Sequence, residues 1–489
     1  MRILYIDIDS LRPDHLGCYG YHRNTSPNID SFAREAVRFN NYYCSDAPCL
    51  PSRTALYTGM FGIHSGVVGH GGTAADLFVE GATRNFRDRV ELQSLPSDLQ
   101  YAGLHTAQVS PFGQRHAARQ FYAGFNEIHN TGKGGMESAE DVTPVVMKWL
   151  ADNASRDNWF LHINYWDPHT PYRVPMTEGE PFGAAPLPAW LTDEVWRKHL
   201  NCVGPHCAQE ISMYDDRESA LFPRQPGSVR TREDLRRMID GYDTGVRFAD
   251  AQFGLIVEAL KRAGVYEDTA IIVSADHGEN MGELGIYGEH GTADHITCRV
   301  PLLIKWPGLA RGGSVDDGLH YNIDLAPTIA ELLGRKPQAL WDGRSFAPAL
   351  QRGEACGRDQ LVISQCAHVC QRSVRFGQWL YIRTYHDGYH LFPKEMLFDI
   401  TNDPHEQNDL SGQHPELCRE GAARLLNWHD EMMASSLTNI DPLWTVMREG
   451  GPFHARGRLR DYCNYLEKTG RGAAIAELRR RHPHEFSDV

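Results

Sequence analysis

The sequence predicts an α/β sandwich with a mostly parallel central sheet, followed by a small antiparallel layer. Short apolar runs alternate with amphipathic stretches through the first 350 residues, and the pattern changes after about Ala347. Strands are expected at 3–8, 159–165, 269–274 and 300–306, and helices at 27–36, 240–264 and 324–333. Parallel sheets bind ligands at the carboxyl ends of their strands, and Asp9 and Asp276 stand at two such ends.

The chain beyond about residue 350 is expected to form two smaller units. Short runs at 361–364, 373–376, 379–384 and 396–400 predict the antiparallel layer, and helical stretches are expected near 460–468 and 472–481. We therefore divide the chain into a large α/β domain (1–350), a β subdomain (351–430) and a helical tail (431–489). Residues 451–489 carry eight Lys or Arg against five Asp or Glu, which predicts a solvated surface or, as a weaker alternative, the arm of a homo-oligomer.

Composition limits the partners of this protein. Its 489 residues carry 49 Lys and Arg against 63 Asp and Glu, a net charge of −14, which argues against nucleic acid because phosphate binding needs clustered cations. The chain begins directly with a charged strand and has no run of 18 apolar residues, so neither a secretory signal nor a membrane partner is expected. The eleven cysteines lack the spacing of a disulfide scaffold. These observations favour a cytoplasmic protein with reduced thiols.

The most specific motif is Cys49-Leu50-Pro51-Ser52-Arg53, which leads into Thr58-Gly59. It resembles the sulfatase signature C-x-P-S-R with its trailing T-G, whereas a buried structural cysteine would leave the ordered Pro-Ser-Arg unexplained. Further blocks at 322–328 and 399–406 extend the resemblance over residues 3–411. It implies the alkaline-phosphatase-like fold, with 1–350 as the catalytic domain, and a separate maturation enzyme that oxidises Cys49 to formylglycine.

Formylglycine explains why this family needs a cysteine. The hydrated aldehyde offers two hydroxyl groups on one carbon, of which one is ionised by a metal ion and attacks sulfur, so that the alcohol leaves and a covalent sulfo-enzyme remains. Deprotonating the second hydroxyl then expels sulfate and restores the aldehyde. Arg53 is expected to hold the diol and the metal ligands through its rigid fork of donors.

Metal ligands are expected at the strand ends. The run from Asp7 to Pro13 resembles the family's opening D-D-x-R-P, although the adjacent acidic pair is replaced here by Asp9-Ser10. Positions 7 and 9 share one face of a strand, so both carboxylates can meet one ion. The run from Ser274 to Glu279 resembles the family's S-D-H-G-E. The predicted ligands are Asp7, Asp9, Cys49, Asp276 and His277. Their oxygen atoms favour Ca²⁺, with Mg²⁺ or Mn²⁺ left open because one ligand is a histidine.

Histidines are expected to supply the sulfate and leaving-group contacts. The run from His169 to Tyr172 resembles the family's H-x-P-Y, so His169 would touch the sulfate or protonate the departing alcohol. The family usually carries a lysine near position 290, and in its place His290 is the expected general acid. The Lys and His of the family's G-K-W-H block are also missing. The further candidates for substrate binding are Arg115 and His116, which lie nearest to that block, and His70 and His295, each equally well explained as an ordinary loop or surface histidine.

Three functions fit this sequence. The first is hydrolysis of a sulfate ester of a small molecule or oligosaccharide. The second is hydrolysis of a phosphonate monoester or phosphodiester with the same formylglycine. The third is a non-catalytic member that binds an anion or a partner, against which the intact set of Cys49, Arg53 and metal ligands argues.

Overall fold

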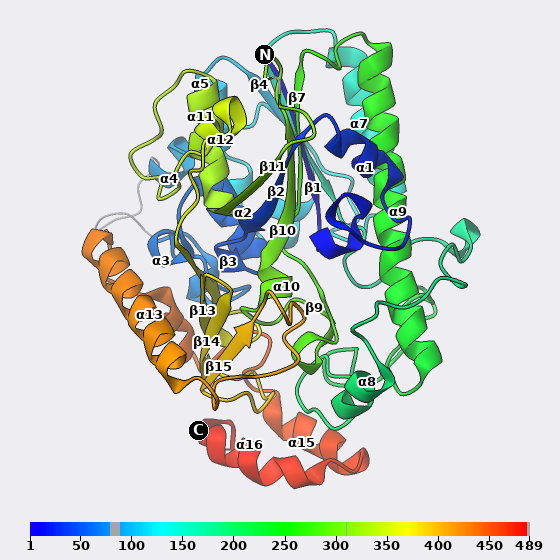
Figure 1. The fold of residues 1–489 in the computed structure, drawn as a ribbon, viewed down its shortest axis with the longest axis vertical. Helices are drawn as coiled ribbons and strands as arrows, with labels where there is room; N and C mark the ends of the chain where they lie inside the picture. Colours follow the sequence, from blue (N-terminus) through cyan, green and yellow to red (C-terminus); the bar gives the residue numbers. More distant parts are fainter. Residues whose placement is uncertain (79–88, 310, 487–489) are drawn as a thin grey trace.

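The described residues form an eight-stranded sheet at the centre of the molecule (Figure 1). The computed structural model describes residues 1–78, 89–309 and 311–486. The strand order is β11-β2-β10-β7-β1-β6-β4-β5. The strands are β1 (Arg2–Ile8), β2 (Val37–Tyr43), β4 (His105–Val109), β5 (Glu127–His129), β6 (Trp159–Tyr165), β7 (Thr269–Ser274), β10 (Arg299–Lys305) and β11 (Val315–Tyr321).

Strand direction in this sheet brings several carboxyl ends to one edge. Neighbouring strands run parallel except for β10, which is antiparallel to both β2 and β7. Strand β1 lies between β6 and β7 and is parallel to both. The residues that follow these three strands therefore meet, as expected for Asp9 and Asp276. The predicted α/β sandwich with a mostly parallel sheet is confirmed.

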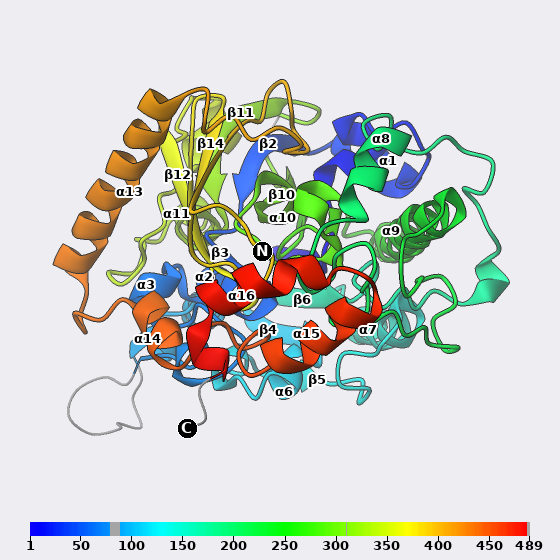
Figure 2. The ribbon, with the colours of Figure 1, turned by 90° about the horizontal axis from the view of Figure 1, so that it is seen from below.

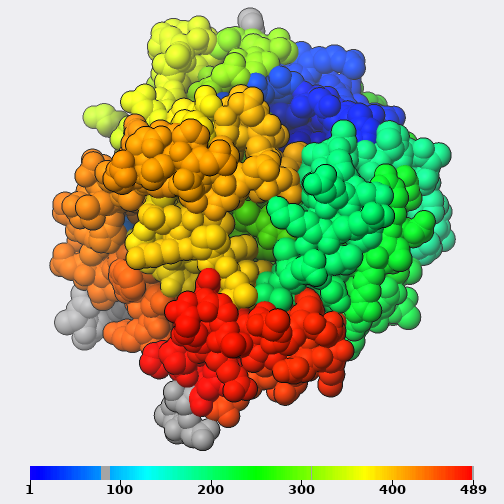
Figure 3. All heavy atoms as spheres, turned by 60° about the horizontal axis from the view of Figure 1, so that its bottom comes forward, coloured from blue at the N-terminus to red at the C-terminus, as the bar shows by residue number. Residues whose placement is uncertain are grey.

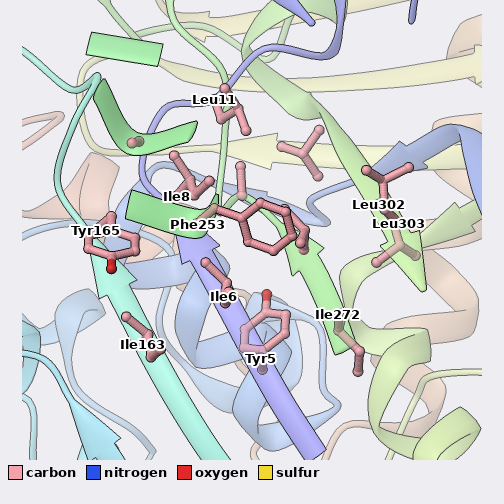
Figure 4. Packing of buried hydrophobic residues seen from close by; sticks show 14 of the residues in the cluster. Tyr5, Ile6, Ile8, Leu11, Ile163, Tyr165, Phe253, Ile272, Leu302 and Leu303 are labelled. Atoms are coloured by element: carbon pink, nitrogen blue, oxygen red, sulfur yellow. The ribbon is translucent and has the colours of Figure 1, made fainter. Parts of the chain in front are cut away.

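Helices cover both faces of the sheet (Figure 1). One group packs together on one face and consists of α1 (Pro27–Ala33), α7 (Ala139–Asn153) and α9 (Arg232–Arg262). The other group consists of α2 (Cys49–Thr58), α5 (Leu95–Tyr101), α11 (Leu325–Leu332) and α12 (Ala347–Arg352). Figure 4 shows side chains of β1, β6, β7 and β10, such as Ile6, Ile163 and Leu303, packed around Phe253 of α9. Burying these apolar surfaces stabilises the sheet that positions the site.

Helix α9 begins earlier than the expected residue 240. It starts at Arg232 because Thr231 accepts a hydrogen bond from the Asp234 amide while the Asp234 carboxylate accepts one from the Thr231 amide. This capping box satisfies amides that would otherwise lack partners at the helix start. The long helix α13 (Pro415–Ser435) was not expected at all; it packs on the small sheet with Trp428 and Leu425 buried.

The small antiparallel layer is confirmed and has one strand more than expected. Its order is β15-β14-β13-β12-β3. The strands are β3 (Asp46–Ala47), β12 (Gln360–Gln365), β13 (Cys370–Phe376), β14 (Trp379–His386) and β15 (Glu395–Asp399). The additional strand, β3, pairs in parallel with β12 and lies immediately before Cys49. The small sheet thus directly supports the segment that leads into the nucleophile motif.

The tail folds back beneath the sheet, on the side where β1 and β7 end (Figures 1 and 2). It contains α14 (Pro442–Arg448), α15 (Leu459–Lys468) and α16 (Ile475–Arg481). A buried ion pair anchors its start, since Arg372 of β13 donates to both oxygens of Asp441 at 2.8 and 2.7 Å. The remaining short elements are α3 (Gly62–Ser65), α4 (Arg89–Leu92), α6 (Phe112–Arg115), α8 (Asp193–His199), α10 (His295–Cys298), β8 (Asn280–Met281) and β9 (Tyr287–Glu289). Among the helices of the described residues, none has the length and apolar composition needed to cross a membrane.

Candidate active site

Cys49 is the first residue of α2 and is buried. Every residue of this helix is buried, and the helix ends at Gly59, which takes the left-handed conformation with φ of 64°. The thiol therefore sits at the positive end of the helix, where a negative charge is favoured. Arg53 follows one turn later and lies on the same face of the helix as Cys49.

The Arg53 guanidinium joins three buried carboxylates. Its Nε lies 2.7 Å from Asp7 Oδ2, its Nη2 lies 3.0 Å from Asp9 Oδ2, and its Nη1 lies 2.5 Å from Asp276 Oδ2. Burial alone would raise the pKa of Asp7, but Arg53 and His162 lower it below its usual range. Burial and the neighbouring Asp276 raise the pKa of Asp9. One arginine thus connects the ends of β1 and β7 to the nucleophile helix.

His277 lies between Cys49 and the carboxylates. Its Nε2 is 3.0 Å from Cys49 Sγ and 3.1 Å from Asp276 Oδ2, while its Nδ1 is 2.8 Å from the Gly278 carbonyl oxygen. Because a carbonyl oxygen only accepts, Nδ1 carries a proton, and the tautomer that keeps this proton when the ring is neutral leaves the Nε2 lone pair facing the site. This is the tautomer that a metal ligand needs.

These donors fit a divalent cation. Ligand atoms of Asp9, Cys49, Asp276 and His277 all lie within 4.8 Å of one another. Asp7 Oδ1 is buried and has no hydrogen-bond donor among the described residues, and Asp9 Oδ2 has the Arg53 guanidinium at 3.0 Å without a well-formed hydrogen bond. Buried carboxylate oxygens without a donor need a compensating positive group, which a hard cation supplies. Asp7 lies outside this group of four; besides Arg53, its carboxylate faces His162 Nε2 at 3.7 Å.

His290 and His169 face the same thiol. His290 Nε2 lies 3.9 Å from Cys49 Sγ and 2.9 Å from Glu289 Oε1, and its ring stacks on His277 at 4.0 Å. The His169 ring lies 5.1 Å from that of His290. Burial opposes ionisation of both His290 and Cys49. Nevertheless, Glu289 raises the pKa of His290 to about 10. His277 and hydrogen bonds from the surrounding imidazoles lower the pKa of Cys49 well below its usual range. The site therefore stabilises negative charge at position 49.

The four expected substrate-binding residues have different surroundings. His70 Nε2 accepts a hydrogen bond from the Leu50 amide at 3.5 Å, and the His116 ring lies 5.3 Å from that of His70. Arg115 is exposed and its guanidinium lies over the Trp166 ring at 4.9 Å. His295 instead bonds Tyr43 through Nδ1 at 2.8 Å, and its backbone amide donates to the Glu406 carboxylate. The structure thus brings His70 and His116 to the nucleophile and places His295 in the packing against the small sheet.

Arg173 is a candidate that the sequence analysis missed. Its Nε and Nη1 are buried and have no hydrogen-bond acceptor among the described residues, while Nη2 donates to the Thr170 carbonyl at 3.3 Å. Burial lowers the pKa of Arg173, and Asp167 and Asp9 oppose this effect. A buried guanidinium with unused donors beside His169 suits an anion. Its position four residues after His169, inside a block already singled out, was the available signal.

The second set of missed residues surrounds His290. Glu289 faces three imidazoles, with its oxygens 2.9 Å from His290, 3.0 Å from His206 and 3.6 Å from His368, each measured to Nε2. His454 of the tail lies beyond them and bonds His70. Glu289 adjoins a residue already chosen from the motif, but His206, His368 and His454 stand in loops without any recognisable pattern.

The family model for sulfatases matches residues 2–335, which contain Cys49, Arg53 and all the predicted ligands. The chain belongs to the sulfatase family. It is accordingly a sulfuric ester hydrolase, as the sequence predicted. The model for the C-terminal part of N-sulphoglucosamine sulphohydrolase matches residues 282–425, so both matches together end before the tail.

Similar proteins include choline-sulfatase of Rhizobium meliloti, which is 26% identical over 442 residues, covering 79% of this chain and 77% of the relative. Among solved structures, the phosphonate monoester hydrolase of Agrobacterium radiobacter has a TM-score of 0.69 at 21% identity and covers 88% of this chain and 96% of its own. A protein solved with its substrate D-glucosamine-2-N,6-O-disulfate has a TM-score of 0.70 at 18% identity and covers 89% of this chain and 98% of its own. These structures share the fold of the sulfatase described here.

Proposed function

We propose that this sulfatase hydrolyses a sulfate ester with a nucleophile formed at Cys49, after a maturation enzyme has oxidised that residue to formylglycine. The supporting observation is the position of Cys49 Sγ, 3.0 Å from His277 Nε2 and inside the group that also contains Asp9 and Asp276. A cysteine with a merely structural role has no need of ionisable side chains gathered around it. When present, formylglycine supplies a hydroxyl group that attacks sulfur and a second whose deprotonation releases sulfate.

Asp9, Asp276 and His277, with the side chain at position 49, would hold the divalent cation, and Asp7 is a further candidate. Ca²⁺ is the first choice for carboxylate donors, and the imidazole leaves Mg²⁺ and Mn²⁺ open. The cation would supply positive charge where the nucleophile and sulfate oxygens meet. The protein's own part is to hold these donors, and Arg53 does so by bonding the carboxylates that converge there.

The remaining side chains divide the work of binding and proton transfer. His169 hydrogen-bonds Cys49, and Arg173 has two buried donors without a partner among the described residues, so both would bind the sulfate oxygens. His290 is the proposed general acid for the departing alcohol, since it lies 3.9 Å from Cys49 Sγ and has a buried Nδ1 without a partner among the described residues. Glu289, bonded to His290 at 2.9 Å, fixes the orientation of its ring.

A phosphonate monoester or phosphodiester is the alternative substrate. The fold resembles that of the Agrobacterium radiobacter hydrolase, and a histidine rather than a lysine stands at position 290. The test compares 4-nitrophenyl sulfate with phenyl 4-nitrophenyl phosphate, using protein co-expressed with a formylglycine-generating enzyme and Cys49→Ala as the control. We expect a higher kcat/KM for the sulfate. A higher value for the phosphodiester would establish the alternative, and no turnover of either ester by fully converted protein would favour a non-catalytic member.

A further inference from the structure

A closed ring of aromatic side chains borders the nucleophile. Each member's ring centroid lies 4.3–6.0 Å from that of the next. The members, in order around what we call the histidine ring, are His169, His290, His368, His454, His70, His116, Phe112 and Trp166. Several of them face α2: His290 lies 3.9 Å from Cys49 Sγ, His70 accepts a hydrogen bond from the Leu50 amide, and Phe112 lies under the Arg53 guanidinium at 4.5 Å. When the nucleophile at position 49 attacks the sulfur of the ester, the displaced alcohol is therefore expected to lie against this ring.

The tail completes the ring. His454 lies outside both family matches, which end at residue 425. Its amide donates to the Ala367 carbonyl at 3.1 Å, its own carbonyl accepts from the Tyr214 hydroxyl at 2.7 Å, and its ring stacks on His368 at 4.3 Å. Figure 3 shows the tail (red) bordering both the yellow segment of the small sheet and the teal segment before α9. The side chain is thus fixed from two directions, as a binding residue must be.

The imidazoles of the ring have hydrogen-bonding capacity left over. The Leu50 amide donates to His70 Nε2, so neutral His70 carries its proton on Nδ1 and donates it to His454 Nε2 at 3.1 Å. His454 then keeps its proton on Nδ1, which has no acceptor among the described residues. His116 Nε2 and His290 Nδ1 are also buried, and neither has a hydrogen-bond partner among the described residues. Burial lowers the pKa of His116 and of His454 to about 3, so both are neutral at pH 7.

The geometry does not suit a second metal ion, although nitrogens of His70, His368 and His454 lie within 4.8 Å of one another. The rings of His368 and His454 are stacked with only 18° between their planes. Imidazole lone pairs lie in the ring plane, so two stacked rings direct them side by side and not towards one point. These three histidines are therefore better placed to bond separate polar atoms.

A quaternary ammonium group is disfavoured as well. Such cations are bound by free aromatic faces, best those of Trp, Tyr or Phe. In the histidine ring, the Arg115 guanidinium already lies over the face of Trp166, 4.9 Å from the ring centroid. The Arg53 guanidinium lies over the face of Phe112, 4.5 Å from its centroid. The nearby carboxylate of Glu289 is occupied by three imidazoles. The neutral imidazoles of His116 and His454 can donate and accept hydrogen bonds, and protonated His290 can donate, a combination that instead matches hydroxyl groups.

We propose that the histidine ring is the leaving-group subsite, that it takes an uncharged, hydroxyl-rich alcohol such as a monosaccharide, and that His454 of the tail determines this specificity. The inference rests on the proposed function, because the alcohol reaches this ring only as the leaving group of an ester that is cleaved at position 49. His454 is assigned a positioning and binding role and no part in bond cleavage.

Binding and turnover test the inference separately. In the Cys49→Ala background, calorimetry with N-acetylglucosamine 6-sulfate should show a Kd about tenfold weaker for His454→Gln, the loss expected for one hydrogen bond. In matured protein, His454→Gln should lower kcat/KM for this sugar sulfate about tenfold more than for 4-nitrophenyl sulfate. His484→Gln, an exposed tail histidine outside the ring, is the matched control and should change neither value. His368→Gln provides a second substitution within the ring and should also weaken sugar binding.

Several results would overturn the inference. If both ring variants keep the wild-type Kd and substrate preference, the histidine ring does not form the leaving-group subsite. A higher kcat/KM for choline sulfate than for the sugar sulfate in the wild type would assign the subsite to a cation. Tight Zn²⁺ binding that His454→Gln abolishes would make the cluster a metal site. If matured protein fails to hydrolyse even 4-nitrophenyl sulfate, the proposed function itself fails, whereas hydrolysis of the aryl ester without sugar specificity refutes only the subsite.

Discussion

Arg53 offers a quantitative test of how the site is held together, because its buried guanidinium faces three buried carboxylates. Arg53→Met removes the charge and leaves Asp7, Asp9 and Asp276 without their common counter-charge. Removing one partner of a buried ion pair costs about 3–5 kcal/mol, and we expect a loss of that size in the free energy of unfolding in chelator. A bound divalent cation offsets the same carboxylate charge, so saturating Ca²⁺ should restore part of the loss.

Urea unfolding of the wild type and Arg53→Met, each in EDTA and in Ca²⁺, measures both quantities. The matched control is Arg372→Met, since Arg372 is also buried but its one ion pair within the described residues is with Asp441, at 2.7 and 2.8 Å. Its loss should not depend on Ca²⁺. The reasoning is refuted by a loss below about 1 kcal/mol for Arg53→Met in EDTA, or by the same Ca²⁺ response in both variants.

Three further predictions concern the general acid, the tail and the cation. His290→Ala should lower kcat for sulfate esters by about 10²–10⁴, with a larger loss for alkyl than for 4-nitrophenyl leaving groups; equal losses would contradict proton transfer by His290. Burial would raise the pKa of Asp387, but His482 lowers it from an ordinary value of 3.8 to about 2. The Asp387 carboxylate therefore stabilises the fold above about pH 4, and this stabilisation is lost as the pH falls towards 2. Asp387→Asn should therefore reduce the free energy of unfolding by about 2 kcal/mol at pH 7 and by almost nothing near pH 2, and a difference that does not depend on pH would contradict this assignment. EDTA should abolish turnover and added Ca²⁺ restore it; activity that survives exhaustive chelation would exclude the proposed cation.

The part of the site that the sequence predicted lies in local motifs at strand ends and at one helix start. Cys49 and Arg53 are one helical turn apart, and Asp9 and Asp276 follow neighbouring parallel strands, so a correct fold class was sufficient to bring them together. His295 was expected either to bind substrate or to be an ordinary surface histidine, and in the structure its ring bonds Tyr43. Sequence proximity to a motif did not fix the direction of its side chain.

The sequence predicted four histidines of the histidine ring as site residues, but not His368 and His454, because their positions depend on how distant loops pack. His368 stands in the turn between β12 and β13, and His454 stands in the tail, 384 residues from its hydrogen-bond partner His70. Strand β3 is a comparable case, since two residues before the nucleophile helix carry no strand signal of their own and extend only because β12 pairs with them. By contrast, the capping box at Thr231 was visible in the sequence and would have given the start of α9.

Catalysis by this sulfatase is proposed to depend on the conversion of the Cys49 side chain to formylglycine. The most direct measurement determines, in preparations with different degrees of maturation, the converted fraction at position 49 by peptide mass spectrometry and kcat for 4-nitrophenyl sulfate. We predict that kcat is proportional to the converted fraction and falls to background when the thiol is intact or Cys49→Ser is used. Undiminished turnover by protein with an unmodified thiol, or by the serine variant, would show that the reaction does not need this conversion.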